Sequence, residues 1–160
     1  MLVAPPFAAE LEAKLLQLNN QYAEELSFKT AQEFSALLAV ASFVRAEAQG
    51  LALLVAMHDK ASYDNANFAW FKNRYDSFMY IDRVVVSEAA RGKGLARLLY
   101  AALENEARLT GRQRLVCEVN ATPANAASDA FHTVLGFVPV GERQVDGAKK
   151  IVRYWCKELA

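Results

Sequence analysis

Two glycines placed one residue apart, Gly92 and Gly94, lie where a strand-like run gives way to a helix-like run. The first turn of a helix leaves four backbone N–H groups without intrahelical partners, and the helix dipole adds partial positive charge there. Glycine lets an anion approach such a backbone closely. Arg91 and Lys93 add cationic side chains beside the glycines. The pattern therefore indicates a phosphate-binding site.

Four interpretations of this segment compete. A Walker loop would need Gly-x-x-x-x-Gly-Lys followed by Ser or Thr, and the sequence has no such run. A dinucleotide fingerprint, as in a nucleotide-binding oxidoreductase, would need a small residue where Arg97 stands, because a large side chain there blocks close packing of helix on strand. The pyrophosphate of coenzyme A satisfies the pattern, and so does a tight turn that binds nothing.

A second motif follows the next predicted strand and runs from Asn125 to Phe137. Together the two motifs resemble those of the GNAT superfamily of acyl-CoA-dependent N-acyltransferases. The first family pattern is Gln/Arg-x-x-Gly-x-Gly/Ala, and the second is Asn-x-x-Ala-x-x-Leu-Tyr-x-x-x-Gly-Phe. The matching residues are Arg91, Gly94 and Ala96 in the first, and Asn125, Ser128, Phe131, Gly136 and Phe137 in the second. The resemblance is close over residues 78–156 and extends to the N-terminal half in element order.

The elements that must position these motifs follow from hydrophobic periodicity and turn residues. We expect a first helix over residues 8–18, ended by Asn19-Asn20, and a second helix that starts after Ser27. Further helices are expected over residues 67–74, over residues 95–109, and from Pro123 to about Leu135. Strands are expected over residues 43–48, 51–57, 78–86, 114–119, 137–145 and 149–156, with a short edge strand within 1–7 and a hairpin turn at Asp146-Gly147. The order predicts an α/β fold, a single GNAT-like domain over residues 1–160 with a mixed, mostly antiparallel central sheet flanked by helices.

The resemblance implies a site for acetyl-CoA built largely from backbone. In the family, the strand before the glycine loop splays from its parallel neighbour, and the pantetheine arm lies in the gap. Val84, Val85 and Val86 stand at that position, with the Val86 amide near the thioester carbonyl. The N–H groups expected to hold the pyrophosphate belong to Gly92, Lys93, Gly94, Leu95, Ala96 and Arg97. Arg91, Asn125 and Ser128 are further expected cofactor contacts.

The implied reaction moves an acetyl group from a thioester to an amine by direct attack. A lysine-like amine has a pKa near ~10.4, so a general base must remove a proton. Glu118 and Asp82 are the candidates, with Glu118 slightly preferred because Cys117-Glu118-Val119 matches the Leu-Glu-Val of some protein-N-terminal acetyltransferases of the family. Strand alternation would place Tyr80, Asp82 and Val84 on one face. A surface charge or salt bridge is the alternative for each carboxylate.

His132 stands where most family members place a tyrosine that protonates the departing sulfur. An imidazole N–H can donate a hydrogen bond, and with a pKa near ~6.5 a fraction is protonated near pH 7. His132 is therefore a candidate acid, and the alternative is a helix histidine that packs beside the cofactor. The change from tyrosine keeps open a second function, a non-catalytic acyl-CoA-binding GNAT domain with a regulatory or structural role.

The segment from His58 to Ser77 is polar and rich in aromatic residues, which either complete the core or line a substrate pocket. Together with its aromatics, Asn65, Asn67 and Arg74 suggest a small or mid-sized polar acceptor. The expected partners are a small-molecule amine or a peptide, and a second copy of the chain in a homodimer.

Composition excludes several other classes. Lys plus Arg and Asp plus Glu both number 18, so no basic excess favours nucleic acid. No apolar run approaches the ~20 residues of a membrane span, and the first ten residues do not resemble a signal peptide. Cys117 and Cys156 are too few for a disulfide framework, and with two histidines no recognisable metal motif can be written. We expect a cytoplasmic protein with no metal and with reduced cysteines.

Overall fold

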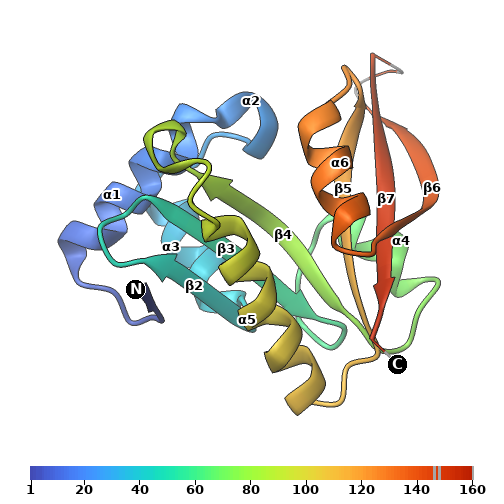
Figure 1. Ribbon diagram of the computed structural model, residues 1–160, viewed down its shortest axis with the longest axis horizontal. Helices are drawn as coiled ribbons and strands as arrows, with labels where there is room; N and C mark the ends of the chain where they lie inside the picture. Colours follow the sequence, from blue (N-terminus) through green and yellow to red (C-terminus); the bar gives the residue numbers. More distant parts are fainter. Residues whose placement is uncertain (146, 148, 160) are drawn as a thin grey trace.

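Helices cover both faces of a central seven-stranded sheet (Figure 1). The computed structural model describes residues 1–145, 147 and 149–159. The sheet order is β1-β2-β3-β4-β5-β7-β6, in which β4 and β5 are parallel and the other neighbours are antiparallel. The strands are β1 (Leu2–Val3), β2 (Phe43–Glu47), β3 (Ala52–His58), β4 (Met79–Val86), β5 (Arg114–Thr122), β6 (Val138–Val145) and β7 (Lys150–Glu158). The helices are α1 (Ala9–Gln21), α2 (Ala23–Leu26), α3 (Ala31–Val40), α4 (Ala66–Lys72), the 3-10 turn η1 (Glu88–Ala90), α5 (Leu95–Leu109) and α6 (Ala126–Val134).

The core consists of two apolar layers, one on each face of the sheet. Helices α1, α3 and α4 supply Leu15, Phe34 and Phe71 to the first layer. Helix α5 supplies Leu99 and Leu103 to the second, against which α6 also packs. The strands contribute residues to both layers, because successive side chains along a strand point to opposite faces of the sheet. The predicted α/β fold with a mostly antiparallel sheet is confirmed.

The aromatic segment between β3 and β4 mainly completes the core. Phe68 and Phe71 are fully buried on the first layer, and Tyr63, Trp70 and Tyr75 pack against them. Among the described residues, no helix has both the length and the apolar character required to cross a membrane.

Sequence predictions about helix boundaries were wrong at Asn19-Asn20 and at Pro123. Helix α1 continues through Asn19 to Gln21, because Asn19 is buried and its side chain hydrogen-bonds Arg83 at 2.7 Å and the Ser27 carbonyl at 3.1 Å. The helix predicted after Ser27 is confirmed as α3, which begins at Ala31 with a capping box from Thr30, whereas the short helix α2 was not predicted. Helix α6 begins at Ala126 rather than at Pro123, because the Asn125 side chain caps it. Of the predicted hairpin turn, Asp146 lies outside the described residues.

The parallel strands β4 and β5 separate partway along their length. They pair at Met79–Leu115, Tyr80–Val116 and Ile81–Cys117, after which β4 remains paired with β3 and β5 with β7. The separation begins at Asp82, which is an extra residue on β4 between the pairs Ala56–Ile81 and Val55–Arg83. Such a bulge bends the strand and increases its twist. The predicted splayed parallel pair is therefore present, and the bulge in β4 coincides with its origin.

The bulge also changes which β4 side chains share a face. Tyr80 and Val85 contribute to the first apolar layer, whereas Val84 packs on the second. The expectation that Tyr80, Asp82 and Val84 lie on one face was wrong, since an inserted residue reverses the alternation beyond it.

Candidate active site

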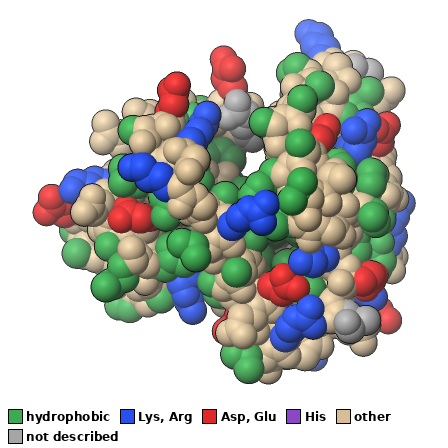
Figure 2. Space-filling model, in the orientation of Figure 1, with side chains coloured by type: hydrophobic (Ala, Val, Ile, Leu, Met, Phe, Trp, Pro, Cys, Tyr) green, Lys and Arg blue, Asp and Glu red, His purple; other side chains and the backbone are tan. Residues whose placement is uncertain are grey.

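A cavity of about 480 Å³ lies between the separated ends of β4 and β5, and the molecular surface is hollowed between the α1–α2 side and the α6 side (Figure 2). Its wall includes the α2 region on one side and the start of α6 on the other. The predicted site residues that line it are Asp82, Val84, Val85, Val86, Arg91, Glu118, Asn125, Ser128 and His132. The structure thus brings together both candidate bases, the candidate acid and much of the expected cofactor site.

Arg91 lines the cavity, and the glycine loop that follows it in the chain lies outside the lining residues. Gly92 and Gly94 have φ of 79° and 77°, in the left-handed region that favours glycine, and Gly94 is the N-cap of α5. A Cβ added to either glycine would meet nothing within 4 Å, so the backbone is open to an approaching group. The loop thus fits a phosphate, since open N–H groups at the start of a helix are an anion-binding arrangement.

The side chains of the other predicted cofactor contacts in the loop and the first turn of α5 differ in their surroundings. Leu95 and Ala96 are half-buried in the first turn of α5. Arg97 lines a separate cavity of about 230 Å³, together with Tyr100 and Lys157. Lys93 is exposed.

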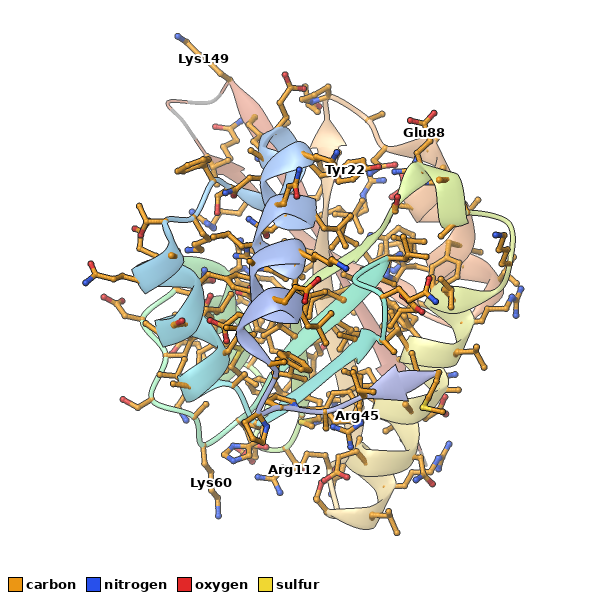
Figure 3. All side chains as sticks on the ribbon, turned by 90° about the vertical axis from the view of Figure 1, so that its left-hand side faces the viewer. Tyr22, Arg45, Lys60, Glu88, Arg112 and Lys149 are labelled. Carbon is orange, nitrogen blue, oxygen red and sulfur yellow. The ribbon has the colours of Figure 1, made fainter. Side chains whose placement is uncertain are left out.

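Arg91 and Tyr22 form part of the cavity wall near the glycine loop. The Arg91 Nε donates to the Val86 carbonyl at 3.3 Å, and its guanidinium lies 5.3 Å from the centre of the Tyr22 ring. The Tyr22 hydroxyl accepts from the backbone N–H of Glu88 at 2.9 Å, and Figure 3 shows the two residues side by side at the top of the molecule. Tyr22 thus joins the end of α1 to η1 beside the loop, a contact that the sequence did not reveal.

Asp82 has both carboxylate oxygens engaged. Oδ1 accepts a hydrogen bond from the Tyr63 hydroxyl, and Oδ2 accepts from the Arg83 Nε at 2.7 Å. Arg83 is itself buried and reaches Asn19 on α1. Burial and the neighbouring Asp82 carboxylate raise the pKa of Tyr63 well above its usual value. Both carboxylate oxygens of Asp82 are therefore engaged by neighbouring side chains in this arrangement.

The two carboxyl oxygens of Glu118 differ in their hydrogen bonding. Its Oε1 accepts from the Tyr80 hydroxyl at 2.8 Å and from the Asn67 Nδ2 at 3.0 Å. Its Oε2 is shielded from solvent and has no hydrogen-bond partner among the described residues. Burial and the charge of Asp82 raise the pKa of Glu118 to about 8, against the opposing effect of the two hydrogen bonds. A carboxyl group with one unsatisfied oxygen and a pKa near neutrality is suited to general base catalysis.

His132 is buried with both ring nitrogens engaged. Nδ1 lies 2.7 Å from the Ser128 carbonyl oxygen, which can only accept, so Nδ1 carries the hydrogen. Nε2 lies 2.8 Å from the Tyr100 hydroxyl and, in the neutral ring, accepts its hydrogen. Burial lowers the pKa of His132, which favours this neutral form. As arranged, His132 has no hydrogen free to donate directly to a ligand.

Tyr100 is a second residue of the cavity wall, after Tyr22, that the sequence analysis missed. It is buried on α5, lines both cavities, and its pKa is raised well above the usual value by burial. A hydroxyl on the apolar face of an amphipathic helix is the signal that could have identified it, because buried tyrosine hydroxyls need a partner. Asn67, expected to contact the acceptor, lines the cavity, whereas Arg74 stacks over the Trp70 ring at 3.7 Å.

Comparisons with known proteins agree with this geometry. A model of the acetyltransferase (GNAT) family matches residues 22–137. The crystal structure of an aminoglycoside 6'-N-acetyltransferase complexed with coenzyme A superposes with a TM-score of 0.75 at 14% identity, over 100% of this chain and 97% of that one. A ribosomal-protein-S18-alanine N-acetyltransferase from Escherichia coli gives 0.70 at 14%, over 100% and 95%. A ribosomal-protein-alanine N-acetyltransferase from Brucella melitensis gives 0.70 at 23%, over 99% of each chain. A sequence search against curated proteins gives no match. At these identities, the structural likeness establishes a shared fold.

Proposed function

Because the chain belongs to the acetyltransferase (GNAT) family, we propose that it is an N-acetyltransferase that moves an acetyl group from acetyl-CoA to a primary amine of a small molecule or peptide. One observation carries this proposal: the wall of one cavity includes Arg91, which leads directly into the open glycine loop, and Glu118, whose carboxyl group has one oxygen without a hydrogen-bond partner among the described residues. A purely structural domain has no need of an unsatisfied buried carboxyl oxygen there.

The residues that would hold the cofactor are those of the loop and of the separated strand. Backbone N–H groups of residues 92–97 bind the pyrophosphate, and the Arg91 guanidinium adds positive charge. Val84, Val85 and Val86 present backbone groups along the gap in which β4 has no partner from β5. Asn125 and Ser128 border the same gap from α6. Acetyl-CoA supplies an activated acyl group as its thioester.

Glu118 acts as the general base in this proposal. An acceptor amine is mostly protonated near neutral pH, and only its neutral form attacks. With its pKa near 8, Glu118 is mostly protonated at neutral pH and half ionised near pH 8, and its ionised form can receive the proton directly or through water. Asp82, held by Tyr63 and Arg83, contributes the negative charge that keeps the pKa of Glu118 high.

The departing sulfur requires modest help, since a thiol has a pKa near ~8.5. We assign this role to His132 together with Tyr100 rather than to His132 alone. The imidazole can donate from Nε2 after it gains a proton and the Tyr100 hydroxyl turns away from it. Alternatively, the Tyr100 hydroxyl itself can turn toward the sulfur, with His132 fixing its resting position.

A second candidate is a non-catalytic acyl-CoA-binding domain with a regulatory or structural role. The observation that favours it is the full engagement of both nitrogens of His132, which leaves no ready donor on that side of the cavity. The two candidates share the cofactor site and differ in turnover.

The deciding experiment measures release of the CoA thiol with a panel of amines, including peptides with free N-termini, between pH 7 and 9. The proposal expects amine-dependent release by the wild type, a large loss in Glu118→Gln, and little change in Glu142→Gln, which alters an exposed carboxylate on β6. Binding of acetyl-CoA without release by any amine would favour the second candidate. Absence of binding would refute both.

A further inference from the structure

Asn67 connects the last hairpin of the sheet to Glu118. It lies at the start of α4, and its Oδ1 accepts hydrogen bonds from the Arg143 Nη2 at 2.9 Å and from the Tyr154 hydroxyl at 2.7 Å. Its Nδ2 donates to the Glu118 Oε1 at 3.0 Å. The chain of contacts therefore runs from β6 and β7, through α4, to β5.

The orientation of the Asn67 amide follows from the chemistry of its partners. The Arg143 guanidinium can only donate, and its Nε also donates to the Tyr154 hydroxyl at 2.9 Å. The Tyr154 hydrogen is then directed to Asn67, so that two donors converge on the same amide oxygen. The amide NH₂ consequently faces Glu118. Rotating the amide by half a turn would place its NH₂ against the Arg143 donor and its oxygen against the Glu118 carboxylate.

We propose that Asn67 is a positioning residue for Glu118: held by Arg143 and Tyr154, it keeps Oε1 as a fixed acceptor, so that Oε2 is the atom that takes the proton from the acceptor amine. This inference rests on the proposed function, because it concerns the same base. It adds that the β6–β7 hairpin, which supplies no group to the reacting atoms, influences the proton affinity of Glu118 through Asn67.

Close packing holds α4 in place on that hairpin. The Trp70 ring stacks on the Tyr154 ring with centroids 4.1 Å apart. A Cβ on Gly141 would lie 2.5 Å from the Trp70 ring, so glycine is required for this approach. At the start of α4, the Asn65 side chain accepts from the backbone N–H of Asn67 at 2.9 Å. The amide of Asn67 is therefore presented from a fixed backbone.

Titratable and charged groups face Glu118 from several elements. Of these, the charge of Asp82 raises its pKa, whereas the hydrogen bonds from Tyr80 and Asn67 lower it. Loss of the Asn67 donor should therefore move the pKa of Glu118 upward. The neighbouring groups are Tyr63, Tyr80, Asp82 and Arg83 from the β3–β4 region, Tyr100 on α5, Cys117 on β5, Arg143 on β6, and Tyr154 on β7.

The test follows the titration of Glu118 directly, by carbon NMR of protein labelled at the glutamate carboxyl carbon, with Glu118→Gln to assign the signal. Asn67→Leu should raise the midpoint by about one to two pH units, the value of one hydrogen bond to a charged group. Asn67→Asp keeps an acceptor for Arg143 and Tyr154 but replaces the donor by an oxygen, so it should also raise the midpoint. If Asn67→Leu does not fold, the midpoint measured in Asn67→Asp tests the proposal. An unchanged midpoint in a folded variant overturns the proposal.

The role of the hairpin is tested by Arg143→Gln. Because Arg143 acts through Asn67, the double variant with Asn67→Leu should titrate like Asn67→Leu alone, and additive shifts would overturn this part. Arg153→Gln is the matched control: it removes the same charge from the same hairpin, on the face where Arg153 pairs with Glu142 at 2.8 Å. Its midpoint should equal that of the wild type.

Turnover separates this inference from the proposed function. In a protein that acetylates an amine, the acid limb of the pH profile of kcat/KM should move upward with the NMR midpoint in Asn67→Leu. If the midpoint moves but no amine is acetylated, the proposed function fails. If amines are acetylated and neither the midpoint nor the acid limb moves, the positioning role fails alone.

Discussion

The carboxyl group of Glu118 should make this protein lose stability as the pH rises. Its pKa is raised from 4.5 to about 8 in the folded protein, and in the unfolded chain it returns to its ordinary value. Between these two pH values the folded protein keeps a proton that the unfolded chain releases, so the free energy of unfolding falls with increasing pH. Over this interval of about 3.5 pKa units, at about 1.4 kcal/mol per unit, the loss is on the order of 5 kcal/mol.

The substitution Glu118→Gln removes the titration while preserving shape. A glutamine can accept at Oε1 from Tyr80 and Asn67 and place its NH₂ where Oε2 now lies, as a protonated carboxyl does. We expect the variant and the wild type to be similarly stable near pH 5, and the variant to be more stable by several kcal/mol at pH 9. The variant should nevertheless be inactive, which is the trade-off often found at catalytic sites.

Urea denaturation followed by circular dichroism at pH 5 to 9 measures this difference. The matched control is Glu10→Gln, because Glu10 is exposed on α1 and its side chain pairs weakly with Lys14 at 3.6 Å. The control should differ from the wild type by a constant amount over the whole range. If the gap between Glu118→Gln and the wild type does not widen from pH 5 to pH 9, Glu118 is not held neutral by burial, and the reasoning that makes it the base is refuted.

Three further predictions concern the cofactor site and the sulfur side of the cavity. Gly94→Val should greatly weaken acetyl-CoA binding measured by calorimetry, whereas Gly111→Val, with a nearly equal φ of 76° and equally open space, should impose the same strain and leave binding intact. His132→Ala should lower kcat by about 10²–10⁴ with little change in acetyl-CoA affinity. His132→Tyr should restore kcat only in combination with Tyr100→Leu, because the longer tyrosine ring would enter the space of the Tyr100 hydroxyl. Full kcat in His132→Ala would exclude the acid role of His132. Cys117→Ala should retain turnover, since the thiol is free and buried with a pKa raised well above its usual value, and loss of all chemistry in a folded, acetyl-CoA-binding variant would instead indicate an acyl-enzyme.

Local patterns in the sequence were sufficient to predict most of the helices and strands and to recognise the family motifs. Helix α5 was predicted with its observed limits, because Gly94 and Gly111 bound a regular apolar stripe. The family motifs were readable for the same reason: a loop that binds an anion through its own backbone is encoded by adjacent residues. The errors at Asn19 and Pro123 arose where a distant residue or a neighbouring cap determined the boundary.

The sequence by itself therefore determined the fold class, the family and several of the chain segments that form the cavity, since these depend on periodicity, turn residues and motif spacing. In the sequence, Asp82 and Glu118 are nearly equivalent candidates for the base, and only the tertiary structure shows how their surroundings differ. Asp82 is occupied by Tyr63 and Arg83, whereas the partners of Glu118, Tyr80 and Asn67, are 38 and 51 positions away in sequence and leave one oxygen unsatisfied. The bulge in β4 and the partnership of Tyr100 with His132, 32 positions apart, were likewise decided by packing. The proton affinity of a buried group depends on its desolvation and on neighbours brought together by the fold, and neither is written in local sequence.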